Sequence, residues 1–285
     1  MSRCFTDRVT HSRPTIHELL DQHGLAARRE LGQNFVADPN TVRRIAELSK
    51  VGEGDLVVEI GPGLGSLTLA LVETGATVVA VEVDTGLANV AREVLGDSAV
   101  VVVADALTLD WDALIAEHQP PEGDESRGVV HVVSNLPYNI GTTLVLDILA
   151  DVPQVHTITV LVQAEVADRF AAGPGSKIYG IPSVMSALHA TSEVVAAVPP
   201  SVFVPKPKVD SSVIRFVRRV EEPEVTHGEL GKVVKAGFGQ RRKMVRRALS
   251  GILTEDEIAA AGVDPTHRAE QLSLQHWILL AKAVR

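Results

Sequence analysis

The tetrapeptide Asn135-Leu136-Pro137-Tyr138 combines residue types that suit the binding of a planar amine. The Asn135 side-chain oxygen and nearby main-chain carbonyls can accept hydrogen bonds from an NH₂ group. Pro137 fixes its own backbone and favours an extended Leu136, while the ring of Tyr138 offers a face for stacking on a heterocycle. The plain alternative is a turn after a strand, because Asn and Pro are ordinary turn residues. Four residues alone do not decide between the two.

A second signal lies upstream, where an apolar run leads into a glycine turn and a helix start: Glu59-Ile60-Gly61-Pro62-Gly63-Leu64-Gly65-Ser66. Glycines let the backbone approach a ligand closely, and N–H groups at a helix start add hydrogen-bond donors. A dinucleotide-binding turn has the pattern G-x-G-x-x-G, which would require glycine at Ser66. The spacing here is G-x-G-x-G. It favours a nucleoside ligand without a pyrophosphate, such as S-adenosylmethionine, bound at Gly61 and Gly63.

Acidic residues follow the next two predicted strands. Glu82 lies about 20 positions after the first glycine, where nucleotide-binding folds place a carboxylate on the ribose hydroxyls. Asp105 follows the apolar run 100–103 and can accept a hydrogen bond from an adenine amino group. One acidic residue after a strand is usually a helix cap or a solvated end. Three successive strands ending near Glu59, Glu82 and Asp105 favour a nucleoside site.

Strands and helices alternate from residue 56 onward, which predicts an α/β fold: a Rossmann-like methyltransferase sheet of parallel strands with helices on both faces. The predicted strands cover residues 56–60, 77–82, 99–103, 129–133 and 156–162. The predicted helices between them cover residues 66–74, 85–95, 141–150 and 163–172. Helices over 14–23 and 39–50 precede the sheet, and late strands cover 194–198 and 212–218. Asn135 then follows a buried strand, where open α/β sheets place ligands.

The 285 residues are expected to divide into a flexible leader (1–13), a methyltransferase domain (14–220) and a small α-helical domain (221–285) that binds RNA. Helices are predicted near residues 226–237, 240–250, 254–261 and 273–284. The proline-dense segment 199–208 predicts a stiff extended loop, which would present Phe203 beside the site as a second stacking partner.

The net charge of −9 conceals an asymmetry along the chain. Residues 51–199 carry four basic and twenty acidic side chains, whereas residues 200–285 carry fifteen basic and ten acidic ones. A basic run is usually a solvated helix face, but seven cations without an intervening acidic residue favour binding of a polyanion. The run consists of Lys232, Lys235, Arg241, Arg242, Lys243, Arg246 and Arg247. Lys206 and Lys208 of the proline-dense segment are further candidates for contact with RNA.

The composition indicates the cellular compartment and argues against disulfides, membrane spans and a metal site. Cys4 is the single cysteine, so disulfides are excluded and a reducing cytoplasm is expected. No apolar stretch reaches the roughly 18 residues of a membrane span, and residues 1–14 lack the apolar core of a signal peptide. The ten histidines show no metal-ligand spacing with Cys4, so no metal site is expected. No obligatory protein partner is expected, and the chain is predicted to be a monomer.

Taken together, these motifs make the chain similar to the rRNA adenine N6,N6-dimethyltransferases of the KsgA type, which modify small-subunit ribosomal RNA. The glycine turn alone is shared by many methyltransferases, but the combination is specific. The resemblance runs from about Leu31 to the end of the chain, and its carriers are Leu31-Gly32-Gln33-Asn34-Phe35, Glu59-Ile60-Gly61-Pro62-Gly63-Leu64-Gly65, Asn135-Leu136-Pro137-Tyr138-Asn139-Ile140, Gln163-Ala164-Glu165-Val166-Ala167-Asp168-Arg169, Pro205-Lys206-Pro207-Lys208-Val209-Asp210-Ser211, Phe238-Gly239-Gln240-Arg241-Arg242-Lys243 and Arg268-Ala269-Glu270-Gln271-Leu272-Ser273.

The resemblance implies the reaction and a division of roles. Two methyl groups would pass from S-adenosylmethionine to N6 of each of two adjacent adenines near the 3′ end of 16S rRNA, within an immature 30S particle during ribosome biogenesis. It implies an N-terminal lid that includes Gln33 and Phe35. It also implies the cofactor contacts: Asn34 and Val36 over the methionine part, Gly61 at the centre, Glu82 on the ribose, Asp105 on the adenine and Asn135 near the reacting methyl.

The expected mechanism is orientation of a poor nucleophile. Hydrogen bonds from N6 to the Asn135 side chain and to the Leu136 or Pro137 carbonyl would favour a pyramidal nitrogen, so no general base is needed before attack. The sequence leaves two alternatives open. One is a large-subunit rRNA adenine methyltransferase of the macrolide-resistance type. The other is a ribosome-assembly or transcription factor that keeps the fold without catalysis.

Overall fold

The computed structural model describes residues 10–28, 32–121 and 123–284. Residues 1–9 of the predicted leader, which include Cys4, lie outside the described residues, and so does Leu31. The chain forms two compact units, one made of Met1–Ala164 and Val194–Phe216, the other of Glu165–Glu193 and Val217–Arg285. The prediction placed the boundary at residue 221 alone. The second unit also takes in residues 165–193, where Tyr179 donates a hydrogen bond to the Leu272 carbonyl at 2.9 Å.

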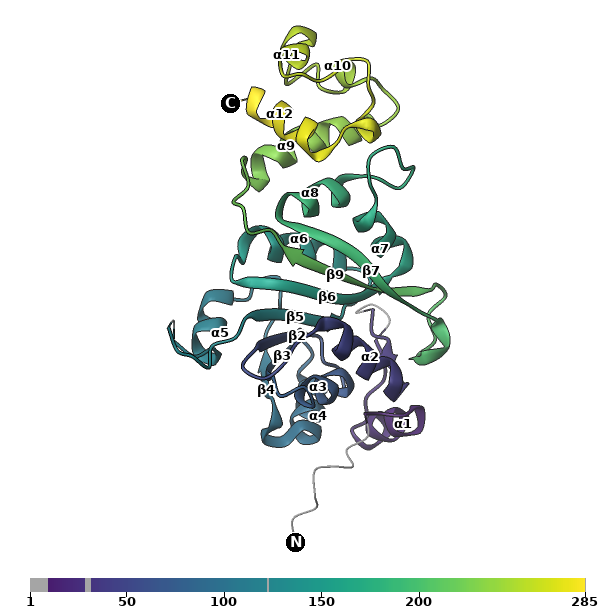
Figure 1. Ribbon diagram of the computed structural model, residues 1–285. Helices are drawn as coiled ribbons and strands as arrows, with labels where there is room; N and C mark the ends of the chain where they lie inside the picture. Colours follow the sequence, from purple (N-terminus) through teal and green to yellow (C-terminus); the bar gives the residue numbers. More distant parts are fainter. Residues whose placement is uncertain (1–9, 29–31, 122, 285) are drawn as a thin grey trace. The chain divides into compact units, whose positions relative to one another are not determined.

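A seven-stranded sheet with the order β4-β3-β2-β5-β6-β9-β7 organises the fold (Figure 1). The pairings β4–β3, β3–β2, β2–β5 and β5–β6 are parallel, as predicted. The sheet as a whole is mixed, which the prediction of a parallel sheet did not include. Its strands are β2 (Leu56–Ile60), β3 (Thr77–Glu82), β4 (Val100–Val103), β5 (Val130–Asn135), β6 (Val155–Gln163), β7 (Ala190–Val198) and β9 (Ser211–Arg218).

Helices flank this sheet, so the predicted α/β class is confirmed. Those of the first unit are α1 (Arg13–Gln22), α2 (Pro39–Ser49), α3 (Ser66–Val72), α4 (Thr85–Leu95), α5 (Trp111–His118) and α6 (Gly141–Asp151). Several begin at aspartates that accept hydrogen bonds from the first turn: Asp38 before α2, Asp84 before α4 and Asp110 before α5. All five residues of β2 are buried, as expected for an interior strand of a sheet covered on both faces.

The second unit is built from α7 (Ala164–Ala171), α8 (Ile181–His189), α9 (His227–Gly239), α10 (Val245–Ala248), α11 (Glu255–Ala260) and α12 (Leu274–Ala283). Capping boxes at Thr226 and Thr254 fix the starts of α9 and α11. The helix predicted over 240–250 is confined to α10, because Met244 is extended and pairs with Arg268 in a β-bridge. The helix α8 was not predicted.

A two-stranded ribbon explains why one sequence expectation is wrong. β1 (Phe35–Val36) pairs antiparallel with β8 (Phe203–Val204), so the residue after the prolines belongs to a strand. Phe203 is 0% exposed and packs in the core against residues such as Val36 and Val42. The proline-dense segment therefore turns Phe203 inward, and its ring is not presented to a ligand.

The predicted flexible leader is also shorter than expected. Thr10 and His11 are buried, at 0% and 5% exposure, and Ser12 caps α1. Ile16 and Leu20 of α1 pack into a cluster with Leu64 and Leu87, so residues from position 10 onward belong to the folded first unit.

Candidate active site

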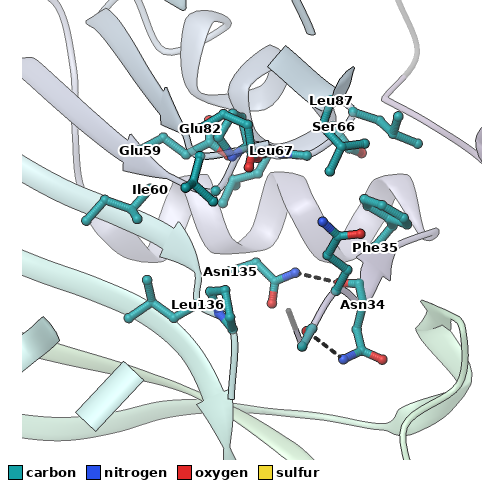
Figure 2. A pocket seen from close by; sticks show the side chains of 18 of the residues that line it. Asn34, Phe35, Glu59, Ile60, Ser66, Leu67, Glu82, Leu87, Asn135 and Leu136 are labelled. Carbon is teal, nitrogen blue, oxygen red and sulfur yellow. Dashed lines mark hydrogen bonds between the residues drawn. The ribbon is translucent and has the colours of Figure 1, made fainter. Parts of the chain in front are cut away.

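A pocket opens at the carboxyl ends of β2, β3 and β5 (Figure 2). Backbone pairing between β2 and β5 ends at Val58–Val132, beyond which the Ser134 hydroxyl accepts a hydrogen bond from the Ile60 N–H at 2.8 Å. Because the chain continues from β2 to β3 on one side and β5 lies on the other, this is the switch point where α/β sheets bind ligands. Of the predicted residues, the pocket gathers Asn34, Val36, Gly61, Gly63, Glu82, Asp105, Asn135, Leu136, Pro137 and Tyr138.

The glycine turn has the backbone conformation that its spacing predicts. Gly61, Gly63 and Gly65 have φ values of 68°, 59° and 83°, a region that side chains disfavour. A Cβ on Gly61 would meet no atom within 4 Å, whereas one on Gly63 would lie 2.9 Å from the Phe35 ring. The turn thus offers an open main-chain surface at Gly61 and packs closely against β1 at Gly63.

Glu82 is held at the end of β3 by two main-chain donors. Its carboxylate accepts hydrogen bonds from the Gly63 N–H at 3.1 Å and the Asp84 N–H at 3.0 Å. It is 5% exposed, and burial raises its pKa in spite of those bonds. A buried carboxylate lining a pocket suits a ligand that donates hydrogen bonds, such as a ribose diol.

Glu59 is a second buried carboxylate in the pocket, and its Oε2 has no hydrogen-bond partner among the described residues. Burial, with a contribution from the charge of Glu82, raises the pKa of Glu59 to about 8. A cationic ligand would favour the ionised form, because an opposite charge nearby offsets the cost of desolvation. The acceptors of this pocket therefore fit S-adenosylmethionine, which carries a sulfonium and an ammonium group, and disfavour a phosphorylated nucleotide.

We expect replacement of Glu59 by glutamine to stabilise the protein in a pH-dependent way. Between the unfolded pKa of 4.5 and the folded value of about 8, the folded state holds a proton that the unfolded state releases. The free energy of unfolding contributed by Glu59 therefore falls as pH rises through that window. Glutamine cannot ionise, so its Tm advantage should grow from near zero at about pH 5 to several degrees at about pH 8.5.

Thermal unfolding of the ligand-free protein at both pH values measures this difference. Glu53→Gln is the matched control, because Glu53 is exposed on the same unit and should show the same Tm as the parent at both values. A Tm offset for Glu59→Gln that does not change with pH would contradict the assignment.

The Asn135 amide is oriented by a hydrogen bond to the segment just before β1. Its Nδ2 donates a hydrogen bond to the Asn34 main-chain carbonyl at 2.8 Å, and Asn34 Nδ2 in turn donates to the Gly32 carbonyl at 3.0 Å (Figure 2). A carbonyl can only accept, so the NH₂ of Asn135 must face Asn34. The Asn135 Oδ1 is then the atom left to accept a bond from a ligand.

The Leu136 and Pro137 carbonyls are the two candidates for the second acceptor of the target amine, and they differ in the hydrogen bonds that they already make. The Pro137 carbonyl accepts from the Ile140 and Gly141 N–H groups, at 3.3 and 3.2 Å. Among the described residues no donor binds the Leu136 carbonyl. The geometry favours Leu136 over Pro137 as the partner of Asn135 Oδ1.

Tyr138 is fixed through its hydroxyl. The Tyr138 hydroxyl and Ser211 Oγ lie 2.8 Å apart in a hydrogen bond, and partial burial raises the pKa of the Tyr138 phenol. Ser211 begins β9 and is 1% exposed. It belongs to a segment that the sequence singled out, but its contact with Tyr138 was not foreseen, because the two residues are 73 positions apart.

Lys206 and Lys208 lie in the stretch between β8 and β9 and are exposed. This stretch is tied at Val204, which pairs with Phe35, and at Ser211, which binds Tyr138. Both ends of the segment that carries the two lysines thus contact residues that line the pocket.

The cations predicted to bind RNA fall into two groups in the second unit. Arg241 pairs with Glu270 at 2.9 Å and donates to the Lys177 carbonyl at 2.6 Å, and Arg246 pairs with Glu255 at 2.7 Å. The side chains with no ion pair or hydrogen bond among the described residues are exposed: Lys232, Lys235, Arg242, Lys243 and Arg247.

The described residues contain neither a membrane-spanning helix nor a cluster of metal ligands. Across 10–28, 32–121 and 123–284, no helix is both long and apolar enough to cross a bilayer. Within the same ranges, no three His, Cys, Asp or Glu side chains lie close enough together to hold a metal ion.

Proteins similar in sequence to this chain point to one family. Residues 24–285 match the family described as ribosomal RNA adenine dimethylase. A ribosomal RNA small subunit methyltransferase A of Cutibacterium acnes is 45% identical over 91% of this chain and 89% of its own, and one of Phenylobacterium zucineum is 43% identical over 95% and 92%.

Solved structures agree with this match. The 23S rRNA methyltransferase ErmE superposes with a TM-score of 0.65 at 28% identity, over 88% of this chain and 99% of its own. A dimethyladenosine transferase of Plasmodium falciparum has a TM-score of 0.68 at 20% identity, over 85% and 94%, which shows the shared fold. The chain belongs to the ribosomal RNA adenine dimethylase family.

Proposed function

We propose that the protein transfers methyl groups from S-adenosylmethionine to N6 of adenines in small-subunit ribosomal RNA, two per base. The observation that carries this proposal is the orientation of Asn135. Its NH₂ is bound to the Asn34 carbonyl, so its oxygen faces the pocket that the glycine turn, Glu59 and Glu82 also line. An amine acceptor and a site for a cationic methyl donor are thus joined in one cavity.

The cofactor is S-adenosylmethionine, which supplies an electrophilic methyl group on a sulfonium. We place its ribose at Glu82, its adenine at Asp105 and its charged part near Glu59 and Gly61. Asp105 is exposed at the pocket wall, with one carboxylate oxygen bound to the Leu107 N–H at 3.0 Å, so the other oxygen is left for an adenine amino group. Val36 is 4% exposed and Asn34 half-buried, and both line the same cavity.

The chain's contribution to the reaction is orientation. The N6 lone pair of adenine is delocalised into the ring, so the free amine is a weak nucleophile. Acceptance of its two N–H bonds by Asn135 Oδ1 and the Leu136 carbonyl favours a pyramidal nitrogen whose lone pair points at the methyl carbon. A new N–C bond forms as the C–S bond breaks, and the proton on N6 then leaves to solvent.

The target adenine must leave its base stack, and the Tyr138 ring offers a new one. Stacking recovers roughly 1 to 3 kcal/mol per base, which offsets part of the cost of unstacking. Because Ser211 holds the Tyr138 hydroxyl, the ring is ordered before the base arrives. Since Phe203 is buried, Tyr138 stands as the stacking partner without the second ring that the sequence suggested.

The RNA-binding role falls to exposed cations of both units. We assign phosphate contacts to Lys206 and Lys208 near the pocket, and to Arg242, Lys243 and Arg247 in the second unit. Arg241 and Arg246 are paired with Glu270 and Glu255 within that unit, and we assign them no phosphate contact. We further propose that the protein acts as a monomer in the cytoplasm, on an immature 30S particle whose adenines near the 3′ end are accessible.

A large-subunit substrate is the second candidate, because ErmE shares the fold over 99% of its own chain. Its identity of 28% is lower than the 40 to 45% of the small-subunit relatives, which favours the first reading. The test offers immature small subunits and naked large-subunit RNA in parallel, each with labelled cofactor. Nucleoside mass spectrometry should find N6,N6-dimethyladenosine in the small-subunit RNA. Its appearance in the large-subunit RNA alone would refute the proposal.

A further inference from the structure

The segment that precedes the family match contributes to the pocket wall. The match to the ribosomal RNA adenine dimethylase family begins at residue 24. His11 and Ile16 lie before that point, yet both line the cavity that holds the glycine turn and Glu82. His11 is 5% exposed and Ile16 is 0% exposed, so both side chains are buried parts of this wall.

His11 is tied to the glycine turn by two hydrogen bonds. Its ring Nε2 lies 2.7 Å from the Leu64 carbonyl, and its main-chain N–H donates to Ser66 Oγ at 3.3 Å. Because a carbonyl only accepts, Nε2 carries the hydrogen. Leu64 and Ser66 flank Gly65, the last of the three glycines with positive φ, so His11 clamps the end of the turn where α3 begins.

Ile16 anchors the same segment from the apolar side. It packs in a cluster with Phe35, Leu64 and Leu87, of which Phe35 also touches Gly63. At the start of α1, Arg13 donates to the Ser201 carbonyl at 2.7 Å. The first turn of the helix is thus fixed to the segment just before β8 as well as to the glycine turn.

We propose that residues 10–22 are a functional part of the cofactor site, in which His11 is a positioning residue that holds the glycine turn in its binding conformation and Ile16 completes the apolar wall. The inference rests on the cofactor assignment made above. A turn of three glycines has many accessible conformations, and a contact that restricts them before binding raises affinity for the ligand. By linkage, the bound cofactor must in turn stabilise residues 10–22.

The test measures binding of S-adenosylhomocysteine to the full chain by titration calorimetry. His11→Ala should weaken binding by about five- to tenfold, the effect of one buried hydrogen bond. His11→Gln should restore most of it, because the glutamine amide places an N–H near the position of the ring Nε2. His17→Ala is the matched control on the same segment, since His17 is exposed, and should bind as the parent does.

Hydrogen exchange of the unmodified protein supplies a second readout, in which the ligand should slow exchange in residues 10–22. Unchanged affinity in His11→Ala would overturn the inference. A weaker affinity that His11→Gln does not restore, with no ligand-dependent protection of the segment, would also overturn it, because that pattern indicates a structural role only. Failure of the unmodified protein to bind S-adenosylhomocysteine would instead refute the cofactor site itself, and the inference with it.

Discussion

Asn135→Ala should lose methyl transfer by about 100- to 1000-fold while the protein still binds S-adenosylhomocysteine. The side chain supplies the acceptor that shapes the target amine, so its loss acts on the transition state. The cofactor keeps Glu82, Asp105 and the glycine turn, and its affinity should fall by less than about tenfold, roughly the effect of one hydrogen bond. Single-turnover methylation of small-subunit RNA measures the first effect, and calorimetry measures the second.

Asn135→Asp separates the two functions of the amide. Aspartate keeps an oxygen that can face the target but lacks the NH₂ that binds the Asn34 carbonyl, so two acceptors would oppose each other at 2.8 Å. Transfer should again fall strongly. Asn89→Ala, on the exposed face of α4, is the control and should leave the rate unchanged. Near-parental transfer by Asn135→Ala would refute the proposed role.

Replacing Arg242, Lys243 and Arg247 together by alanine should weaken RNA binding by about 10- to 100-fold at physiological salt. Each phosphate contact releases counterions, so the slope of log affinity against log salt should fall by about 2 to 3. The three side chains are exposed and make no bond with other described side chains, so the fold should be unaffected. Equilibrium binding to small-subunit RNA at several salt concentrations measures both quantities.

Two further variants make this result specific. Neutralising Arg44, Lys50 and Arg127, which are exposed on the first unit, removes the same number of charges and should leave most of the slope. Arg241→Ala should act differently, because it breaks the pair with Glu270 and the bond to the Lys177 carbonyl. It should lower the Tm of the protein and leave most of the salt slope unchanged. A triple variant with the parental slope would contradict the assignment.

The sheet and the cofactor turn were predictable because their signals are local. Runs such as Leu56–Ile60 and Thr77–Glu82 carry their own strand pattern, and the glycine spacing specifies its own backbone. What the sequence did not predict depends on distant partners. Phe203 is a core residue because Phe35 and Val36 pair with its strand. No pattern within the proline-dense segment predicts that pairing.

The same limit applies to the site. The residues Gly61, Glu82, Asp105 and Asn135 could be placed from their position at strand ends, and the structure gathers them around one pocket. The contribution of His11 could not be foreseen, because its partners are 53 and 55 positions away and no motif surrounds it. The helix predicted over residues 14–23 was the one signal available, and it does not indicate where that helix packs.

The two buried carboxylates have a consequence for competition inside the cell. Adenosine is the common part of many abundant metabolites, most of which carry phosphates. Glu59 and Glu82 are buried carboxyls with raised pKa values, so an anionic group beside them would further disfavour their ionised forms, whereas a cationic group would favour them. The pocket therefore discriminates by charge between a cationic methyl donor and anionic nucleotides that share its adenosine.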